Sequence, residues 1–136
     1  MAPRIEGVWH EHLDLYWPVV RDWIDEAVRY AANCWTVDDV LRDLKARKMQ
    51  LWVVWTDRPV CALVTEIYDT AAGTTCAIPI VGGELALECL DLLSVIEQWA
   101  KEQGCVRLRG EGRRGWERAL KAHGWQPITT QVEKRL

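Results

Sequence analysis

The stretch TCAIPIVGGELALECLDLLSVIEQWA, residues 75–100, decides the fold. Its apolar, β-branched beginning is typical of a strand, which we expect at Thr74–Ile80, and Gly82 and Gly83 are expected to break that strand. The apolar residues that follow recur at helical spacing and predict a long helix that Gly104 ends. They are Leu85, Cys89, Leu92, Ile96 and Trp99. A helix that begins directly after such a strand points its free N–H groups at open space, where they can hold an anion.

Two helices and an edge strand are predicted before this stretch. Ile5–Trp9 is expected to form the short edge strand. The first helix begins at Trp17, with Pro18 in its first turn, and ends at Asn33. The second, shorter helix follows Thr36, whose side chain suits an N-cap, and carries acidic residues in its first turn and basic residues at its end.

Three strands joined by short turns come next and predict an antiparallel meander. They are Met49–Trp55, Val60–Tyr68 and Thr74–Ile80, with Asp69–Gly73 as the second hairpin loop.

After the long helix we expect a strand at Cys105–Arg109, a helix that carries Trp116 and Leu120 and ends at Gly124, and a final strand at Pro127–Val132. A helix that joins two strands of one sheet implies a locally parallel pair. The sequence therefore predicts a single α/β domain over residues 1–136. Its order is (β)ααβββαβαβ, and its mixed, mostly antiparallel sheet has helices on both faces.

Composition excludes several classes of protein. The chain is 49% apolar and 27% charged, which is typical of a folded globular protein. Its apolar runs are too short to span a membrane and no secretory signal opens it, so we expect an intracellular protein. The five cysteines and three histidines show no metal-binding spacing, and we expect the cysteines to be buried free thiols. Most of the nine tryptophans are expected to pack in the core in place of phenylalanine.

Charge is divided unevenly along the chain. Residues 1–100 hold eight Lys and Arg against sixteen Asp and Glu, a net charge of −8, whereas residues 101–136 hold nine against four, a net charge of +5. The basic end is expected either to meet an anionic ligand or partner or to pair with the acidic part of the same chain. The acidic balance of the whole chain argues against nucleic acid.

The order of elements and two motifs resemble the GNAT acetyltransferase family. The motifs are Ile78–Leu85 and Gly115–Trp125, which ends in the Gly-aromatic pair of the family's last helix. In detail, GRRGWERALKAHGW, residues 112–125, and IEQWAKEQGC, residues 96–105, are most similar to small GNAT-like proteins of tailed phages and prophages. The resemblance implies that acetyl-CoA lies where the fourth and fifth strands splay apart, with its diphosphate on the N-terminus of the helix after the fourth strand.

Three features depart from the family pattern. Only two adjacent glycines remain of the diphosphate loop, and Glu84 directly after them would repel phosphate by roughly 3 kcal/mol per unit charge at ~5 Å. Leu120 stands where the family often has the tyrosine that protonates the leaving thiolate. Tyr68, His123 or Cys105 would have to replace that acid, and no spacing favours one of them.

The resemblance assigns the candidate site residues. The cofactor-binding candidates are Ile80, Val81, Gly82, Gly83, Arg113 and Arg114. Glu66 is the candidate base; its other interpretation, an ordinary solvent-facing residue of an alternating strand, is the one the sequence favours. The cluster Arg107, Arg109, Arg113 and Arg114 has three interpretations: a site for the phosphates of acetyl-CoA, a surface for an acidic partner, or ion pairing within the chain.

Two functions of different classes follow from these residues. The first is a phage-type GNAT-fold protein with a degenerate acetyl-CoA site, acting without catalysis or with weak activity. It would bind a phage or host protein through Trp-rich and Arg-rich surfaces, in the host cytoplasm or in the virion. The second is an active acetyl-CoA-dependent N-acyltransferase whose acceptor is a small amine or a protein amine. Neither requires a metal or a membrane.

Overall fold

The computed structural model describes residues 2–30, 34–84, 87–111 and 114–136. Its elements follow the chain in the order β1 (Arg4–Gly7), η1 (His10–His12), α1 (Leu13–Tyr30), α2 (Val37–Lys45), β2 (Met49–Trp55), β3 (Pro59–Thr70), β4 (Gly73–Gly83), η2 (Leu87–Leu92), α3 (Leu93–Glu102), β5 (Arg107–Gly110) and α4 (Arg114–Lys121), where η1 and η2 are 3₁₀ helices.

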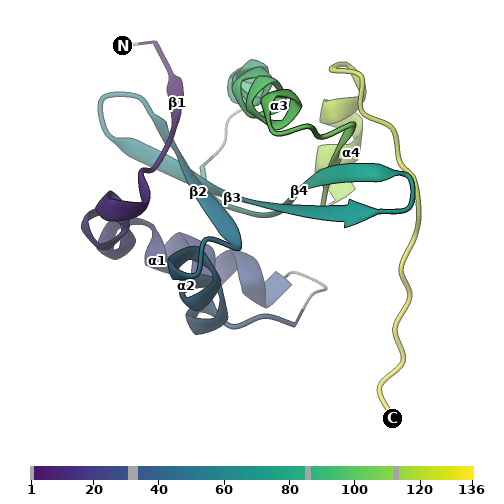
Figure 1. Ribbon diagram of the computed structural model, residues 1–136, viewed down its shortest axis with the longest axis horizontal. Coiled ribbons are helices and arrows are strands. Elements are labelled where there is room, and N and C mark those ends of the chain that lie inside the picture. The colour runs from purple at the N-terminus through teal and green to yellow at the C-terminus, as the bar shows by residue number, and fades with distance from the viewer. Residues whose placement is uncertain (1, 31–33, 85–86, 112–113) are drawn as a thin grey trace.

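The five strands form one sheet in the order β1–β2–β3–β4–β5. Neighbouring strands are antiparallel except for β4 and β5, which are parallel because α3 carries the chain from one to the other. In Figure 1, α1 and α2 lie on one face of the sheet and α3 on the other. The predicted fold class, a mixed and mostly antiparallel sheet with helices on both faces, is confirmed.

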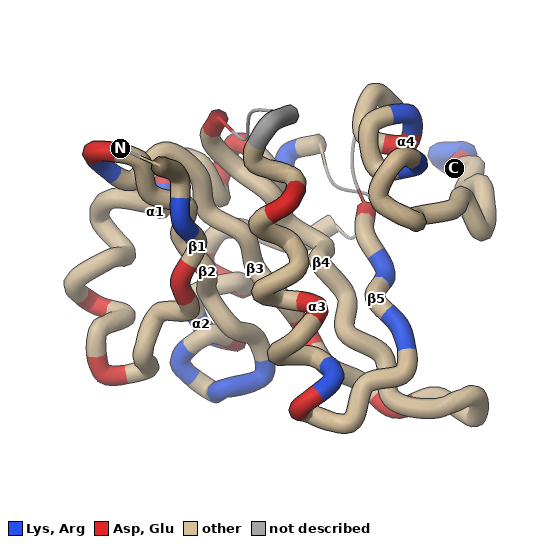
Figure 2. The backbone as a smooth tube through the Cα atoms, turned by 90° about the horizontal axis from the view of Figure 1, so that it is seen from above, with Lys and Arg blue, Asp and Glu red and all other residues tan. Residues whose placement is uncertain are grey.

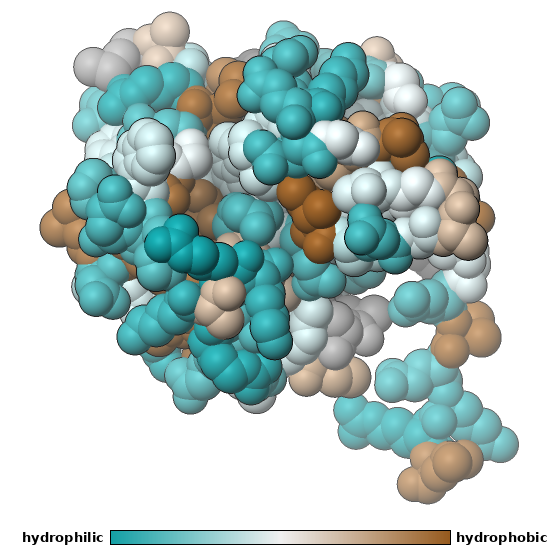
Figure 3. Space-filling model, viewed as in Figure 1, coloured by the Kyte–Doolittle hydropathy of each residue, from teal (hydrophilic) through white to brown (hydrophobic). Residues whose placement is uncertain are grey.

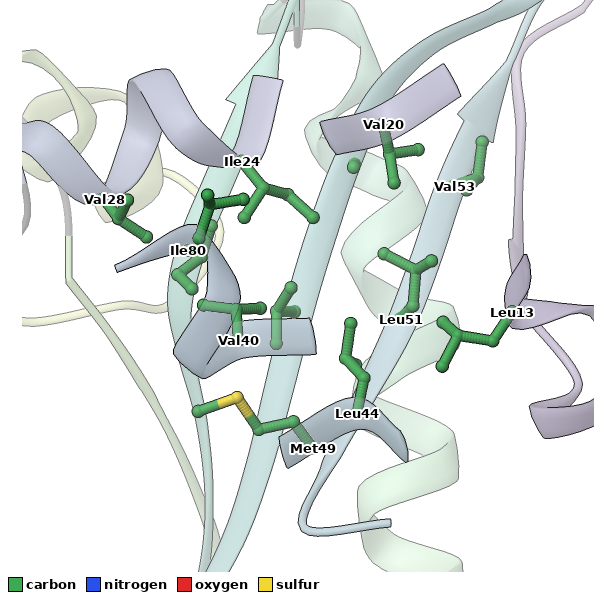
Figure 4. Packing of buried hydrophobic residues seen from close by; sticks show 13 residues of the cluster. Leu13, Val20, Ile24, Val28, Val40, Leu44, Met49, Leu51, Val53 and Ile80 are labelled. Atoms are coloured by element: carbon green, nitrogen blue, oxygen red, sulfur yellow. The ribbon is translucent and has the colours of Figure 1, made fainter. Parts of the chain in front are cut away.

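The first core lies between the sheet and helices α1 and α2 (Figure 4). Val20 and Ile24 of α1 and Val40 of α2 are fully buried against the alternate residues of the strands. Thr36 caps α2 as predicted: it accepts a hydrogen bond from the Asp39 N–H, and the Asp39 carboxylate accepts one from the Thr36 N–H.

Helix α1 begins earlier than predicted. It starts at Leu13 instead of Trp17, so Pro18 lies inside the helix and not in its first turn. Leu13 is buried in the first core, and its packing starts the helix one turn before the proline. The predicted end at Asn33 falls outside the described residues.

The second core lies between the other face of the sheet and α3. Ile96 and Ala100 of α3 pack on Cys61, Leu63 and Ile78. Gly104 ends α3 as predicted: it has φ +85°, and the N–H of the next residue donates to the Ala100 carbonyl. The cysteines are free thiols as expected, but they are not all buried, because Cys34 is exposed.

Gly82 and Gly83 do not break β4. Both pair with β3, Gly82 opposite Ala62 and Gly83 opposite Cys61. A Cβ atom on Gly82 would lie 2.4 Å from the Trp23 carbonyl oxygen, and one on Gly83 would lie 2.5 Å from the Val60 carbonyl oxygen. The glycines therefore extend the strand and let the backbone of α1 contact it directly.

The predicted long helix does not begin at the glycines either. The segment η2 comes first, and α3 is a ten-residue helix that starts at Leu93. Its predicted buried face is otherwise correct, since Cys89 and Ile96 are buried and Glu97 is exposed; Leu85 lies outside the described residues. No α-helix N-terminus in the described chain therefore lies next to Gly83.

Two strand boundaries also differ at the C-terminal half. The second hairpin is tighter than the predicted Asp69–Gly73 loop, because β3 continues to Thr70 and β4 resumes at Gly73. The predicted final strand Pro127–Val132 is absent, and residues 126–136 are exposed and irregular. In Figure 1 this tail leaves the body of the molecule after α4.

The contact between Gly82 and α1 predicts a large effect of a small side chain. Gly82→Ala is expected to lower the free energy of unfolding by about 2–3 kcal/mol, because the new methyl group must displace the backbone of α1. Gly115→Ala is the matched control, since nothing lies within 4 Å of its Cβ position, and it should cause no loss. Urea unfolding followed by circular dichroism measures both. Equal midpoints for Gly82→Ala and the unmodified protein would show that α1 does not sit against β4.

Candidate functional site

The sheet opens between β4 and β5. The two strands pair over only four residues, from Thr75 with Arg107 to Ile78 with Gly110. The register of β3 against β4 shifts at the same place, because two residues of β4, Ile78 and Pro79, lie opposite Thr65 alone. A bulge of this kind bends and twists a strand. Proline is tolerated at a bulge because the ladder is interrupted there and does not need the N–H that proline lacks. Beyond Pro79, β4 has no strand partner on the β5 side among the described residues.

The bulge also changes which peptide groups face the opening. The Glu84 N–H donates to the Val60 carbonyl at 2.9 Å. Residues that bond a neighbouring strand alternate along an antiparallel ladder. The residues of this segment that bond β3 are therefore 84, 82 and 80. Val81 lies between them and turns its N–H and C=O away from β3. These two groups therefore form a strand edge in the opening that no strand of the described residues covers.

The predicted cofactor-binding residues do not all face this opening. The Ile80 side chain is buried in the first core, and the peptide groups of Ile80 and Gly82 face β3. Val81 supplies the free edge. Arg113 lies outside the described residues, and Arg114 is the first residue of α4. The cofactor contacts of these residues stay predictions.

Glu66 lies on the sheet face that carries α2, one step from the bulge. It is paired with Ala77 and half buried. An open hollow of about 450 Å³ lies over it, lined by Trp35, Asp43, Arg47, Lys48, Gln50, Glu66 and Ile67. Burial raises the pKa of the Glu66 carboxyl, and the negative charges of Asp43 and Glu111 raise it further. Glu66 is thus a carboxylate that its surroundings make more basic than usual, and not a freely solvated one.

Glu111 connects Glu66 with the mouth of the opening. It directly follows β5, and its N–H donates to the Ile78 carbonyl at 3.3 Å, where the β4–β5 ladder ends. Its negative charge is one of the causes that raise the pKa of the Glu66 carboxyl. The base candidate and the free edge of β4 therefore belong to one region of the molecule.

Tyr68 shares the sheet face of Glu66, two residues further along β3. Arg109 Nη1 lies 3.5 Å from its hydroxyl oxygen. Arg107, on the same face of β5, donates to Thr75 Oγ1 at 3.0 Å and to the Ala72 carbonyl at 2.9 Å. Figure 2 shows the basic charge along β5. Arg107 thus holds the β3–β4 hairpin through neutral acceptors, and the ion pairing with acidic residues of the chain, the third interpretation of the cluster, stays a prediction.

The other two candidates for a proton donor lie elsewhere. His123 Nδ1 is 3.4 Å from the Asp91 carboxylate, and Cys105 packs in the core under α3. Burial raises the pKa of both Cys61 and Cys76 to about 12, so neither thiol forms a thiolate nucleophile at neutral pH. Tyr68 is the candidate that the structure brings to the side of Glu66.

Sequence reasoning missed three residues of this region: Asp43, Pro79 and Glu111. Pro79 was detectable, because a proline inside an apolar strand pattern signals a bulge or an edge. Asp43 and Glu111 were not, because they come from α2 and from the end of β5 and meet Glu66 only in the folded chain.

In the described ranges no group of three His, Cys, Asp or Glu residues could hold a metal ion, and no helix is long and apolar enough to cross a membrane.

Comparison with solved structures identifies the architecture. Glucosamine-6-phosphate N-acetyltransferase from Arabidopsis thaliana superposes with a TM-score of 0.67 at 10% identity, with 99% of each chain covered. A predicted acetyltransferase with acetyl-CoA from Clostridium acetobutylicum has a TM-score of 0.68 at 15% identity, covering 98% of this chain and 96% of the other. The chain has the GNAT fold.

Other proteins with this fold act on different acceptors by name. A ribosomal-protein-alanine N-acetyltransferase from Brucella melitensis biovar Abortus 2308 superposes with a TM-score of 0.65 at 11% identity, with 99% and 98% of the chains covered. No protein-family model matches the sequence, and no curated protein is similar to it. At these identities the GNAT likeness concerns the fold alone.

The surroundings of Glu66 predict a pH-dependent cost in stability. The pKa of the Glu66 carboxyl is raised in the folded state, so the fold favours the protonated form. The resulting stabilisation is fully present below the pKa of the carboxyl in the unfolded chain, about 4.3, and is lost as the pH rises through its pKa in the folded chain. Glu66→Gln is therefore expected to raise the melting temperature at pH 7 and to lose this advantage near pH 4.

Differential scanning calorimetry between pH 4 and pH 8 measures this effect. Glu26→Gln, an exposed change of the same kind on α1, is the control and should leave the melting temperature unchanged across the range. A Glu66→Gln variant that melts below the unmodified protein at pH 7 would show that the carboxylate stabilises the fold.

Proposed function

We propose that the chain is an acyl-CoA-dependent N-acyltransferase, with Glu66 as the base that receives the proton of an acceptor amine. The observation that carries this proposal is the coincidence of a free strand edge at Val81 with a carboxyl of raised pKa on the adjacent strand. The GNAT fold supports the proposal, since several proteins that share it are acetyltransferases by name.

The opening suits an extended donor that carries amide groups. The N–H and C=O of Val81 can each bond an amide of such a chain, as a strand edge does when it accepts a further strand. Acetyl-CoA has an extended arm with two amides and would supply an acyl group activated as a thioester. The residues that would meet its diphosphate include 84–86 and 112–114, which are described only in part.

Glu66 is suited to the acceptor side. The hollow over it is open to solvent and is lined by two carboxylates, Glu66 and Asp43, and two cations, Arg47 and Lys48, so it offers polar groups of both signs to an acceptor. The raised pKa brings Glu66 closer to the pKa that a base needs near neutral pH. Tyr68 lies on the same face, two residues along β3, and in this proposal it would return a proton to the leaving thiolate, a role that Leu120 cannot fill.

Replacement of the base predicts a change in rate without a change in donor affinity. Glu66→Gln is expected to lower kcat by about 10²- to 10³-fold, because general base catalysis is lost, and to leave the dissociation constant of acetyl-CoA unchanged. The rate of the unmodified protein should rise with pH as Glu66 ionises, above the ordinary range of a carboxyl, and Glu66→Gln should lack this rise.

The rate is measured as thiol release from acetyl-CoA with three probes: an amino-sugar phosphate, an aminoglycoside and a peptide with a free N-terminus. Glu26→Gln is the control. Equal rates and equal pH profiles for Glu66→Gln and the unmodified protein would remove Glu66 from the mechanism.

The free edge of β4 is tested by removing one N–H. Val81→Pro is expected to weaken acetyl-CoA binding about 5- to 10-fold in isothermal titration calorimetry, the effect of one hydrogen bond of about 1 kcal/mol. The fold should survive, because this N–H does not bond β3. Val81→Ala keeps the N–H and should bind like the unmodified protein. Circular dichroism checks that both variants fold, and unchanged affinity in a folded Val81→Pro variant would contradict the assignment.

A second candidate function is favoured by the loop after β4. Glu84 is exposed directly after Gly83, and the described chain has no α-helix N-terminus there to hold a diphosphate. This arrangement suits a phage-type relative with a degenerate acetyl-CoA site, which acts as an interaction or virion-associated protein through its Trp-rich and Arg-rich surfaces, in the host cytoplasm or the virion. The same calorimetry separates the two candidates. Saturable micromolar binding of acetyl-CoA supports the transferase, and no binding at millimolar ligand supports the interaction protein.

A further inference from the structure

A buried chain of hydrogen bonds leads from the second core to the hollow over Glu66. The Trp52 Nε1–H donates to Thr65 Oγ1 at 3.0 Å, and the Thr65 hydroxyl donates to Gln50 Oε1 at 2.9 Å. Trp52 and Thr65 are buried, whereas Gln50 is half buried and lines the hollow. The chain therefore connects a core residue with a side chain of the proposed acceptor site.

Packing holds Trp52, the first member of this chain, in place. Its ring lies edge-on to Trp99 of α3, with 5.2 Å between the ring centroids, and 3.4 Å from the Cβ position of Gly7 on β1. An indole nitrogen can donate a hydrogen bond but cannot accept one. Thr65 Oγ1 is therefore the acceptor of the bond from Trp52, and the hydroxyl hydrogen of Thr65 remains for a second partner.

This chain also fixes the orientation of the Gln50 amide. Thr65 is fully buried, and within the described residues Gln50 Oε1 is the acceptor that its hydroxyl has. If the amide were turned around, the buried hydroxyl would lose that acceptor, which is unfavourable. The amide oxygen therefore stays on Thr65. The two Nε2 hydrogens of Gln50 have no acceptor in the described part of the chain and remain for a ligand in the hollow.

Two cations line the same hollow. Arg47 and Lys48 follow α2 and are exposed, and in the described ranges neither of them forms an ion pair. Asp43, which also lines the hollow, lies 3.3 Å from Arg42 Nε instead. The surface over α2 is mainly hydrophilic (Figure 3). Together with Gln50, the two cations bring N–H donors from three side chains to the hollow.

Donors and carboxylates in one hollow suit a ligand that carries groups of both signs. N–H groups of guanidinium, ammonium and amide side chains bind the oxygens of a carboxylate or a phosphate, and charge assistance makes such bonds stronger than neutral ones. The Glu66 carboxylate has the opposite preference and suits an amine. A simple alkylamine would leave the donors of Gln50 and Arg47 without a partner in the ligand.

We propose that the acceptor amine of this protein also carries an oxyanion, a carboxylate or a phosphate, and that Gln50, Arg47 and Lys48 bind this oxyanion while the amine lies at Glu66. This inference rests on the proposed transferase function and names the class of its acceptor. Gln50 is a specificity-determining residue of the site. Thr65 is a positioning residue, which acts through the orientation of the Gln50 amide.

Two matched pairs of probes test the proposal in the thiol-release assay. One pair is an amino sugar and its phosphate ester; the other is propylamine and β-alanine, which has a carboxylate in place of the terminal methyl group. The anionic member of at least one pair is expected to have a KM lower by about tenfold or more. A preference in the sugar pair identifies a phosphate as the anion, and a preference in the other pair identifies a carboxylate.

Gln50→Glu replaces the amide NH₂ with an oxygen of similar size and keeps the acceptor for Thr65. Its KM for the preferred anionic probe is expected to rise about tenfold or more, with a much smaller change in kcat, because the new oxygen repels the oxyanion. Gln103→Glu, the same change at an exposed residue outside the hollow, is the control. Thr65→Val should weaken the preference for the anion, and Thr65→Ser, which keeps the hydroxyl, should restore it.

Equal KM values within both pairs would overturn the proposal while leaving the transferase intact. A preference for the anionic probe that Gln50→Glu does not reduce would overturn it as well.

NMR of the ¹⁵N-labelled protein without acetyl-CoA decides the matter if no probe releases thiol, a result that would contradict the transferase function. Shifts of the Gln50 side-chain amide signals with an anionic probe, and not with its partner that lacks the anion, would support the oxyanion site. Unchanged Gln50 signals with all four probes would overturn it.

Discussion

The bulge of β4 at Ile78 and Pro79 is the feature on which the candidate site depends. Before it, β4 is hydrogen-bonded on both sides, to β3 and to β5. After it, the alternation of peptide groups is reversed, so that the groups of Val81 point to the side where β5 has ended. A strand edge in the middle of a sheet normally leaves backbone N–H and C=O groups without hydrogen-bond partners, which costs free energy. Here the edge begins where β5 ends, and the single extra residue of the bulge decides that the groups of Val81 lie on it; proline, without an N–H, occupies the bulge.

The rest of the fold keeps the opening in place from one side. Gly82 and Gly83 hold β4 against β3, while the backbone of Trp23 in α1 lies on Gly82 and the ring of Trp23 lies on Gly83. The glycines therefore have a structural reason to be glycine that is independent of any phosphate. The Glu84 N–H is bonded to Val60 and cannot serve a ligand in the same position. An anion cradle at this glycine pair, as first expected from the sequence, is replaced by a packing contact between helix and strand.

Sequence patterns predicted the strands of the meander, the caps of α2 and α3, and the parallel pairing of β4 with β5, because each of these rests on local periodicity or on a single capping residue. The sequence patterns failed where a contact between residues distant in the sequence decides the local structure. Leu13 starts α1 early because its side chain is buried in the core, and Gly82 stays in β4 because β3 pairs with it. The Pro127–Val132 pattern is typical of a strand, but in the structure this segment is exposed and pairs with no described strand. Glu66 was favoured as a solvent-facing residue, and its half-buried position beside Asp43 and Glu111 came only from the tertiary structure.

Amide hydrogen exchange at residue level tests the central claim most directly. In the free protein the Val81 amide should exchange fast, while the amides of Ile80 and Gly82 on either side should exchange slowly because they bond to β3. Addition of acetyl-CoA should slow Val81 and leave its two neighbours unchanged. A Val81 amide that is already protected in the free protein, as strongly as those of Ile80 and Gly82, would show that the edge is closed and would contradict the account.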